Sequence, residues 1–588
     1  MLKGTASHGR VIELHSTPPL LGGEASYSTI ATGANEWQLA LGSLQSSGSI
    51  RYTLTLQERE PTPHFSHDGS RNHERDSEQG ARRQEYATTS PGDLGLVISS
   101  FTAYNVSVGD VYFCSGQSNM ERGVNDVYDV EYWQEDATNF TQIIRLWRVP
   151  YPTAPGLSHP NGSFIRDNCA VEGDCTPDNT SMQRNSRVSH WVPVTADNVL
   201  FFSSPCYFTA RAISRGLTGQ RPIGLVVSAV GGTPIQSWLP TDTFNTCRLP
   251  NDTIICDPEV EGQCNDQPWD LPSGLYNAMV FPLISLPVRA ILWWQGEANT
   301  NEGYSSTQSE YTCMLQQLVL SWRSLWRREN LPFLVVQLQP WLGNAGFSQP
   351  WNPAWSDVTS RIRVAQAQAV ENLSLRDHHS NGRSVGKLVS DSSVQVAVIF
   401  DIGDAAAAPS GGGGLHPKNK EQISERLAAH LFNMTFARGA APAYPIPVLA
   451  RKFAQDDDLF TIELQLQNAE GLQIVPTRSC EYIYDGTCCG ANGTTANVAM
   501  FVVGSDMNDA SYNPLYTDDD GISWNLANTV QIHSLNISGS EGFLHLTARI
   551  PSASNISYLH YGLADYATCS VNNRDLPLGP FSYMSIQQ

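Results

Sequence analysis

A serine placed directly after an apolar strand is the first candidate for chemistry in this chain. Residues 110–122 read Asp-Val-Tyr-Phe-Cys-Ser-Gly-Gln-Ser-Asn-Met-Glu-Arg. The apolar run 111–114 predicts a buried strand, and the Ser-Gly-Gln break predicts a tight turn into a helix. Ser118 at this turn has two interpretations. It is either a nucleophile whose neighbouring N–H groups face an oxyanion, or an ordinary helix N-cap.

Further polar or small residues follow other predicted strands. They are Gly231, Gly232, Gln295, Glu297, Asp401 and Asp404, with His416 just before a predicted helix. Because ligands bind beyond the carboxyl ends of parallel strands, these residues should converge with Ser118 at one edge of the sheet. Ester hydrolysis by serine requires a nucleophile, a base and oxyanion donors. We expect Ser118 as nucleophile and His416 as base. The expected donors are the N–H of Ser118, an N–H of Gly231 or Gly232, and the Gln295 amide.

The pattern of apolar runs predicts the elements that position these side chains. Near-continuous apolar runs, typical of strands buried on both faces, lie at 111–114, 223–230, 288–294, 333–338 and 394–400. Helical stretches lie between and after them at 205–217, 310–328, 357–370 and 418–432. This alternation predicts an α/β fold, a five-stranded parallel sheet with helices on both faces. Cysteine-containing insertions at 150–193 and 241–270 are expected to be braced by disulfides whose pairing the sequence leaves open.

We expect three domains. An N-terminal β module covers 1–108 and carries a disordered insertion at 57–93, which is rich in charge, Ser, Pro and Gly. The α/β domain covers 109–438. Short strands without long helices at 439–588 predict a C-terminal β-sandwich-like domain. The histidines of the insertion, His64, His67 and His73, are interpreted as part of a solvated loop rather than a metal site.

Several ordered motifs resemble the sialate O-acetylesterases, a family within the SGNH (GDSL-like) hydrolases. They are Cys-Ser-Gly-Gln-Ser-Asn-Met at 114–120, Ala-Val-Gly-Gly-Thr-Pro-Ile-Gln-Ser-Trp at 229–238, Trp-Trp-Gln-Gly-Glu-Ala-Asn at 293–299, Arg-Val-Ala-Gln at 363–366, Asp-Ile-Gly-Asp at 401–404 and Leu-His-Pro-Lys-Asn-Lys at 415–420. The resemblance implies a flavodoxin-like SGNH fold with an oxyanion glycine in the second motif. Gln295 stands where many SGNH enzymes have asparagine.

The resemblance implies a serine esterase that removes O-acetyl groups from sialic acids through an acetyl-enzyme, with no metal or organic cofactor. An acetylesterase for xylan or another polysaccharide is the alternative within enzymes. The alternative of a different class is an inactive carbohydrate-binding glycoprotein, which the intact Ser118 and His416 disfavour. The expected partner is an O-acetylated sugar; oligomeric state is left open.

The sequence departs from the SGNH pattern at the catalytic acid. Many SGNH enzymes have aspartate three residues before the histidine, and this chain has Gly413 there. Asp404 is our first choice for the acid that orients His416, because the small-residue run after it leaves slack for folding back. Asp401 is the second choice. The remaining alternative is a Ser–His dyad.

Other residues near these motifs keep two interpretations each. Arg122 and Arg363 are candidates to bind an anionic sugar, or they form ordinary helix-surface ion pairs. Glu297 is favoured as a partner that fixes its loop over a general acid. Cys114, at the end of a buried strand, is expected to be core or disulfide-bonded rather than reactive.

Composition limits the class of protein. The chain has 588 residues and a formal net charge of −21, which argues against nucleic acid and anionic membranes as partners. No apolar run reaches the ~20 residues that span a bilayer. Twelve cysteines without a Cys-x-x-Cys pair, together with ten Asn-x-Ser/Thr sequons, predict a secreted or lysosomal glycoprotein with disulfides. Residues 1–30 lack the apolar core of a signal peptide, so we expect a truncated or mis-started N-terminus. The sequons begin at Asn105, Asn139, Asn161, Asn179, Asn251, Asn372, Asn433, Asn492, Asn536 and Asn555.

Overall fold

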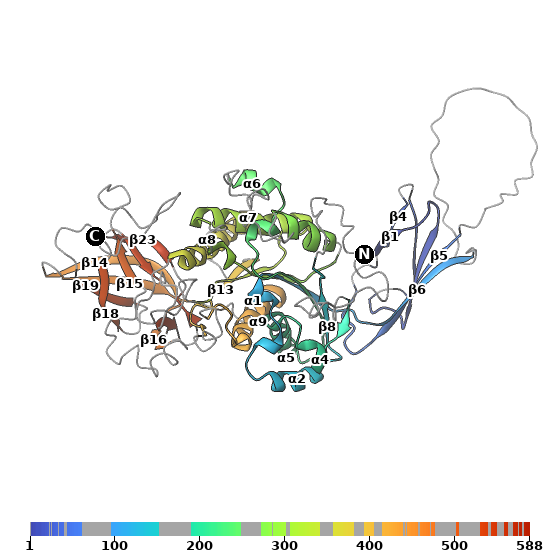
Figure 1. The fold of residues 1–588 in the computed structure, drawn as a ribbon, viewed down its shortest axis with the longest axis horizontal. Helices are drawn as coiled ribbons and strands as arrows, with labels where there is room; N and C mark the ends of the chain where they lie inside the picture. Colours follow the sequence, from blue (N-terminus) through green and yellow to red (C-terminus); the bar gives the residue numbers. More distant parts are fainter. Residues whose placement is uncertain are drawn as a thin grey trace, which may run out of the picture. The chain divides into compact units, whose positions relative to one another are not determined.

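The structure is a computed structural model and divides into two compact units (Figure 1). The first unit comprises Met1–Asp110 with Gln220–Pro222, and the second comprises Val111–Gly219 with Ile223–Gln588. The residues described are 2–587 except 61–95, 152–189, 248–271, 301–305, 341–356, 381–392, 405–413, 477–500, 505–529 and short breaks at 23, 25, 33–34, 40, 42–43, 285, 439–441, 443, 457–458, 471, 539–542, 550–557, 562–568, 574–575 and 579–580. Within the described residues, no helix is both long and apolar enough to cross a bilayer.

A seven-stranded, mostly parallel sheet forms the centre of the second unit. Its order is β13 (Val394–Ala397), β12 (Phe333–Val336), β11 (Ala290–Trp294), β7 (Asp110–Gly116), β10 (Ile223–Ala229), β8 (Ile144–Arg148) and β9 (Val192–Pro193). β9 is antiparallel to β8, whereas the pairs β8–β10, β7–β11, β11–β12 and β12–β13 are parallel. All five predicted strands lie in this sheet, but the predicted number was too low. β9 has only two residues, and in β8 (Ile-Arg-Leu-Trp-Arg) two arginines interrupt the apolar run.

Helices cover both faces of this sheet, as predicted. α7 (Gln308–Leu325) and α8 (Asp357–Ser380) pack together on one side, and α5 (Ser204–Gly216) and α9 (Lys420–Phe436) pack together on the other (Figure 1). Two apolar cores result, one for each face. Successive residues of β7 serve them in turn: Phe113 belongs to one core, and Tyr112 and Cys114 belong to the other. Because β7 is packed against a core on each face, the position and direction of its carboxyl end, which precedes Ser118, are fixed.

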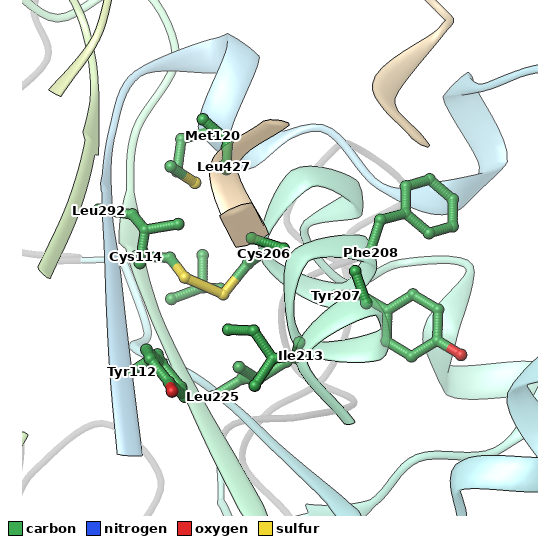
Figure 2. Packing of buried hydrophobic residues seen from close by; sticks show 14 of the residues in the cluster. Tyr112, Cys114, Met120, Cys206, Tyr207, Phe208, Ile213, Leu225, Leu292 and Leu427 are labelled. Carbon is green, nitrogen blue, oxygen red and sulfur yellow. A yellow bond between two sulfur atoms is a disulfide. The ribbon is translucent and has the colours of Figure 1, made fainter. Parts of the chain in front are cut away.

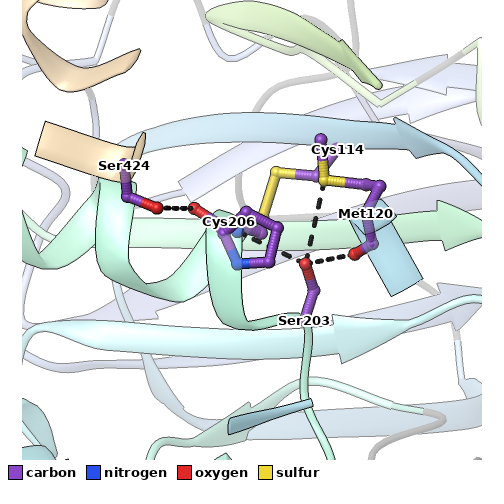
Figure 3. The surroundings of a disulfide bond; sticks show 6 residues. Cys114, Met120, Ser203, Cys206 and Ser424 are labelled. Atoms are coloured by element: carbon purple, nitrogen blue, oxygen red, sulfur yellow. Dashed lines mark hydrogen bonds between the residues drawn. A yellow bond between two sulfur atoms is a disulfide. The ribbon is translucent and has the colours of Figure 1, made fainter. Parts of the chain in front are cut away.

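A disulfide between Cys114 and Cys206 joins β7 to α5 inside the second of these cores (Figure 2). Ser203 caps α5, because its hydroxyl accepts the N–H of Cys206 at 3.3 Å. The same hydroxyl donates to the carbonyl of Met120 at 2.6 Å (Figure 3). The chain on both sides of Ser118 is therefore tied to one helix start. The expectation for Cys114 is resolved in favour of a disulfide.

A second disulfide joins Cys247, which follows α6 (Asp242–Thr246), to Cys313 of α7. It anchors the start of the insertion predicted at 241–270 to the helical layer. The other cysteines of the two predicted insertions, Cys169, Cys175, Cys256 and Cys264, lie outside the described residues.

The elements described in the first unit are all strands. β1 (Leu2–Thr5) pairs with β4 (Glu36–Leu39), and a four-stranded antiparallel sheet has the order β3 (Ser26–Ile30), β2 (Val11–Thr17), β5 (Tyr52–Arg59), β6 (Val97–Val106). The insertion predicted to start at 57 begins too early, because β5 continues to Arg59 through ladder pairs with β2 and β6. The rest of this insertion, with His64, His67 and His73, lies outside the described residues, apart from Glu60.

The C-terminal strands form a closed sheet instead of the predicted sandwich. Its order is β14 (Ile446–Asp456), β15 (Leu459–Gln467), β19 (Phe543–Arg549), β18 (Val530–Ser538), β17 (Phe501–Gly504), β20 (Tyr558–Tyr561) and β23 (Phe581–Gln587). Closure comes from the parallel pairing of β14 with β23, which removes both free edges. A second sheet contains β16 (Leu472–Pro476), β21 (Cys569–Asn573) and β22 (Leu576–Pro577).

Candidate active site

Ser118 and His416 meet at the carboxyl edge of the sheet. The Ser118 hydroxyl lies 2.8 Å from Nε2 of His416, although 298 residues separate them in the sequence. Ser118 opens the short helix α1 (Ser118–Glu121), directly after β7. Gly116 makes this turn with a φ of +138°, and a Cβ there would lie 2.0 Å from the carbonyl oxygen of Trp294 on β11. Only glycine fits this position, so the turn that presents Ser118 requires Gly116.

The environment of His416 keeps its imidazole neutral. Burial, followed by the positive charges of Arg122 and Lys420, lowers the pKa of His416 to about 3. A neutral ring in the tautomer that carries its proton on Nδ1 has a free Nε2 lone pair facing the Ser118 hydroxyl, which is what a general base requires. Two cations close enough to shift this pKa also give the site a locally positive field, in contrast to the net charge of the chain.

A buried polar network lies behind this pair and joins the loops that carry both residues. The side chain of Asn119 donates to Glu297 at 2.5 Å and to the carbonyl of Leu415 at 2.9 Å, and it accepts from Lys420 at 2.5 Å. Gln339 donates to the same two acceptors, at 3.2 and 2.8 Å. Because Asn119 follows Ser118 and Leu415 precedes His416, the network sets the spacing of nucleophile and base. Glu297 is thus placed as a loop-fixing partner, the role that we favoured for it.

Lys420 and Glu297 are both buried charges in this network. Burial lowers the pKa of Lys420 to about 7, opposed in part by Glu297, and burial raises the pKa of Glu297. The ammonium of Lys420 also lies 4.1 Å above the ring of Trp294, a cation–π contact that compensates for lost hydration. Buried charges are tolerated only with such partners, which explains why four side chains converge behind the Ser118 turn.

The two candidate acids have different partners. The carboxylate of Asp404 accepts from the backbone N–H of Lys418 at 2.6 Å and from the hydroxyl of Tyr128 at 2.9 Å. It therefore holds the turn that carries His416. Asp401 instead forms a two-pronged ion pair with Arg426 of α9, at 2.7 and 3.0 Å. This pairing ties Asp401 to α9. Asp404 stays our first choice for the acid that orients His416, with Asp401 or a Ser–His dyad as the alternatives.

The glycine turn after β10 approaches Ser118 closely. A Cβ on Gly231 would lie 3.2 Å from the Ser118 Cβ and 3.1 Å from Oε2 of Glu121. The N–H of Gly231 donates to that same Oε2 at 2.7 Å, so an acidic side chain occupies one predicted oxyanion donor. Gly232 has a φ of +79° and is exposed. Within the described part of the chain, the N–H groups of Ser118 and Gly232 are bonded to no acceptor.

Gln295 is placed differently from the prediction. It is fully buried, and its amide nitrogen lies 2.7 Å from the side-chain oxygen of Asn299 and 3.2 Å from Gln117 Oε1 and from the carbonyl of Thr233. Its own oxygen accepts from Tyr311 at 2.9 Å. Two amide hydrogens facing three internal acceptors leave none for an oxyanion. This geometry favours Gln295 as a support for the Gln117 turn over the predicted donor.

Of the two arginines predicted to bind substrate, only Arg122 lies at the site. Arg122 is about two-fifths exposed, with a guanidinium 3.0 Å from Asp126, and its charge acts on His416. Arg363 is completely buried and donates to the carbonyls of Leu338 and Gln339 at 3.0 and 2.9 Å. The prediction for Arg363 does not hold, because a side chain without exposed surface cannot contact a sugar.

Sequence reasoning missed Asn119, Glu121, Arg148 and Lys420 as site residues. Asn119 and Glu121 lie within the serine motif and Lys420 within the histidine motif, so a question about each motif's buried neighbours would have found them. Arg148 carried no signal, since it ends the strand that was not predicted. Among the described residues, no group of three or more His, Cys, Asp or Glu side chains is arranged to hold a metal ion.

The fold and the Ser–His pair are typical of serine hydrolases built on an open α/β sheet. Comparison with known proteins shows which hydrolases this chain is similar to. Residues 162–390 match the family model described as "Carbohydrate esterase, sialic acid-specific acetylesterase". This segment contains the Gly231 turn and Gln295 but begins after Ser118 and ends before His416. Sialate O-acetylesterases are similar in sequence: 27% identity over 281 residues to that of Mus musculus and 28% over 247 residues to that of Homo sapiens.

These matches confirm the resemblance to sialate O-acetylesterases. They cover 42% and 40% of this chain, and 46% and 40% of the mouse and human proteins, so the chain matches a little less than half the length of these relatives. Among solved structures, a carbohydrate acetylesterase from Xanthomonas citri is similar with a TM-score of 0.59 and 20% identity. The alignment spans 99% of this chain and 94% of that one, which shows a similar fold throughout.

Proposed function

We propose that this protein is a serine esterase that removes O-acetyl groups from sialic acids through an acetyl-enzyme. Ser118 Oγ attacks the acetyl carbonyl carbon while its proton passes to Nε2 of His416. The tetrahedral oxyanion collapses, the sugar oxygen leaves with the proton from His416, and the acetyl group stays on Ser118. Water, deprotonated by His416, then attacks the acetyl-serine. Acetate and free Ser118 result, and His416 returns its proton to the serine oxygen.

The observation that carries the proposal is the 2.8 Å contact between Ser118 and a neutral His416. A helix-capping serine would not need a partner 298 residues away, and an inactive sugar-binding protein would not need the pair to be held by a buried network. In this proposal the N–H groups of Ser118 and of the turn at Gly231 and Gly232 bind the oxyanion. Asp404 positions His416 through the backbone of Lys418.

An anionic sugar is the substrate that the local charges favour. The chain repels anions at long range with its net charge of −21. Beside His416, however, the charges that act on the ring are those of Arg122 and Lys420. Arg122 is partly exposed and is available to a sugar carboxylate, whereas Lys420 is buried. The family match and the curated relatives support the same class of substrate.

The test compares O-acetylated sialic acid with neutral acetylated xylan, using wild type, Ser118→Ala and Arg122→Met. We expect Ser118→Ala to be inactive on both. Arg122→Met should lose about tenfold in kcat/KM on the sialic acid and little on a neutral chromogenic acetate, since one charge-assisted hydrogen bond is removed. Higher activity of wild type on xylan would overturn the substrate assignment in favour of a polysaccharide acetylesterase.

The setting of this activity is part of the proposal. We propose an SGNH-like esterase domain at 109–438 between a β module at 1–108 and a β domain at 439–588. We also propose a secreted or lysosomal glycoprotein, supported by two disulfides and by the ten sequons. Intact-mass measurement before and after removal of N-glycans, with and without reductant, tests the localisation: an unglycosylated chain with only free thiols would contradict it.

A further inference from the structure

Glu121 stands where the acetyl oxygen of a substrate has to bind if Gly231 is an oxyanion donor. Its Oε2 lies 2.7 Å from the N–H of Gly231, which is the distance that an oxyanion donor requires. Glu121 is the last residue of α1, three positions after Ser118, so both side chains lie on one face of this turn. An N–H that holds a carboxylate is not available to a substrate. A negative charge there would also repel the oxyanion that forms on Ser118.

The buried guanidinium of Arg148 offers a second binding position for this carboxylate. Arg148 ends β8 and has a side chain only 3% exposed. Its Nη2 donates to the carbonyls of Glu121 and Phe201, at 2.9 and 3.1 Å. Its Nε and Nη1 are buried and have no hydrogen-bond acceptor in the described part of the chain. Glu121 Oε1 lies 4.0 Å from Nη1, so a shift of roughly 1 Å would bring it into hydrogen-bond distance.

We propose that the Glu121 side chain blocks the oxyanion hole in the unliganded protein. It holds the Gly231 N–H in the unliganded protein and swings to Arg148 when the acetyl oxygen takes its place. This inference rests on the proposed esterase function and on Gly231 as a donor. No atoms are exchanged in the step: one hydrogen bond from Gly231 is replaced by bonds from Arg148, and the vacated N–H receives the carbonyl oxygen of the ester.

The product acetate competes with Glu121 for the N–H of Gly231. Acetate is itself a carboxylate and would bind to the same N–H after deacylation. The returning Glu121 competes with it, so the wild-type protein should be inhibited only weakly by acetate. Removing Glu121 should therefore increase both acylation by a small ester and inhibition by acetate. A residue that merely supports the glycine turn would produce neither increase.

The experiment measures kcat/KM for a neutral chromogenic acetate and the inhibition constant of sodium acetate in Glu121→Ala and Glu121→Gln. The matched control is Glu131→Ala, which removes an exposed carboxylate ten residues further along the chain. We expect Glu121→Ala to raise kcat/KM and tighten acetate inhibition by about tenfold each, the effect of one charge-assisted hydrogen bond. The neutral Glu121→Gln should show a smaller rise, and the control should show none.

Arg148→Met supplies the independent arm. Without the guanidinium of Arg148, the Glu121 carboxylate has no alternative partner and stays bound to Gly231, so turnover should fall. Adding Glu121→Ala to Arg148→Met should restore turnover. If Glu121→Ala does not fold, Glu121→Gln decides by the same sign. Unchanged or slower acylation in the folded Glu121 variants would refute the proposal that Glu121 blocks the oxyanion hole, and Glu121 would then be a positioning residue for the glycine turn. Turnover by Ser118→Ala would instead refute Ser118 as the nucleophile, and no hydrolysis of any acetyl ester by the folded wild type would refute the esterase function, so these failures are distinguishable from failure of the Glu121 proposal.

Discussion

The acid limb of the pH–rate profile should lie near pH 3, because burial and two neighbouring cations lower the pKa of His416 to about 3. An unperturbed histidine, with a pKa of about 6.5, is only about 3% neutral at pH 5 and would lose about 30-fold in rate there. At a pKa of about 3 the ring is about 99% neutral at pH 5, so kcat/KM should stay at its plateau. The assay is release of acetate from a neutral ester in quenched samples, since this substrate does not titrate.

Folding has to be followed in the same samples. His416 and His430 both have a pKa lowered to about 3 by burial. Between pH 6.5 and 3 the unfolded chain therefore binds protons that the folded chain does not. Stability falls as the pH falls through this window, by a few kcal/mol for a fully buried ring. Rates are normalised to the folded fraction measured by circular dichroism.

A variant checks the cause of the shift. Arg122→Met removes one of the cations that lower the pKa of His416, so its acid limb should move to higher pH. The matched control, Arg327→Met, changes an exposed arginine of the loop after α7 and should leave the limb in place. An acid limb near pH 6.5 in the wild-type protein, with the fold intact, would refute the electrostatic reasoning.

Three further predictions concern the framework. Asp404→Asn should lower kcat by about 10- to 100-fold with little change in KM, because the turn that carries the histidine loses a charge-assisted bond; Asp401→Asn should instead lower the melting temperature, and the reverse pattern would exchange their roles. Gly116→Ala should yield little folded protein, because its Cβ would lie 2.0 Å from a backbone oxygen; a wild-type melting curve would contradict this. Removing the Cys114–Cys206 disulfide, which spans 92 residues, should cost about 4 kcal/mol in the free energy of unfolding, measured by urea denaturation, and an unchanged midpoint would contradict the bond.

Periodicity was sufficient to predict the elements that bury both faces. The five strands that were predicted in the central sheet are near-continuous apolar runs, and the four long helices have an apolar face. Strand β8 escaped prediction because its arginines interrupt the apolar pattern. Burial of Arg148 depends on the carbonyls of Glu121 and Phe201, which the sequence does not reveal.

The pairing of side chains was the part that sequence could not supply. Ser118 was predicted because its motif follows a strand, and His416 because it lies just before a predicted helix. The resemblance of both motifs to a known family supported the pair. The partners of Asp401, Asp404 and Gln295 depend on contacts across many residues. The sequence does not show whether an arginine in a helix motif contacts a ligand or donates to buried carbonyls. Arg363 donates to buried carbonyls. Likewise, short strands alone did not distinguish a sandwich from a sheet closed by the pairing of β14 with β23.

The most direct test of the account is to trap the acetyl-enzyme. Protein quenched in acid during turnover of an acetyl ester is digested, and the acetylated peptide is identified by mass spectrometry, with Ser118→Ala and His416→Ala treated in parallel. We expect one acetyl group on Ser118 in the wild-type protein and none at that position in either variant. Acetylation of another residue, or steady turnover by Ser118→Ala, would contradict it.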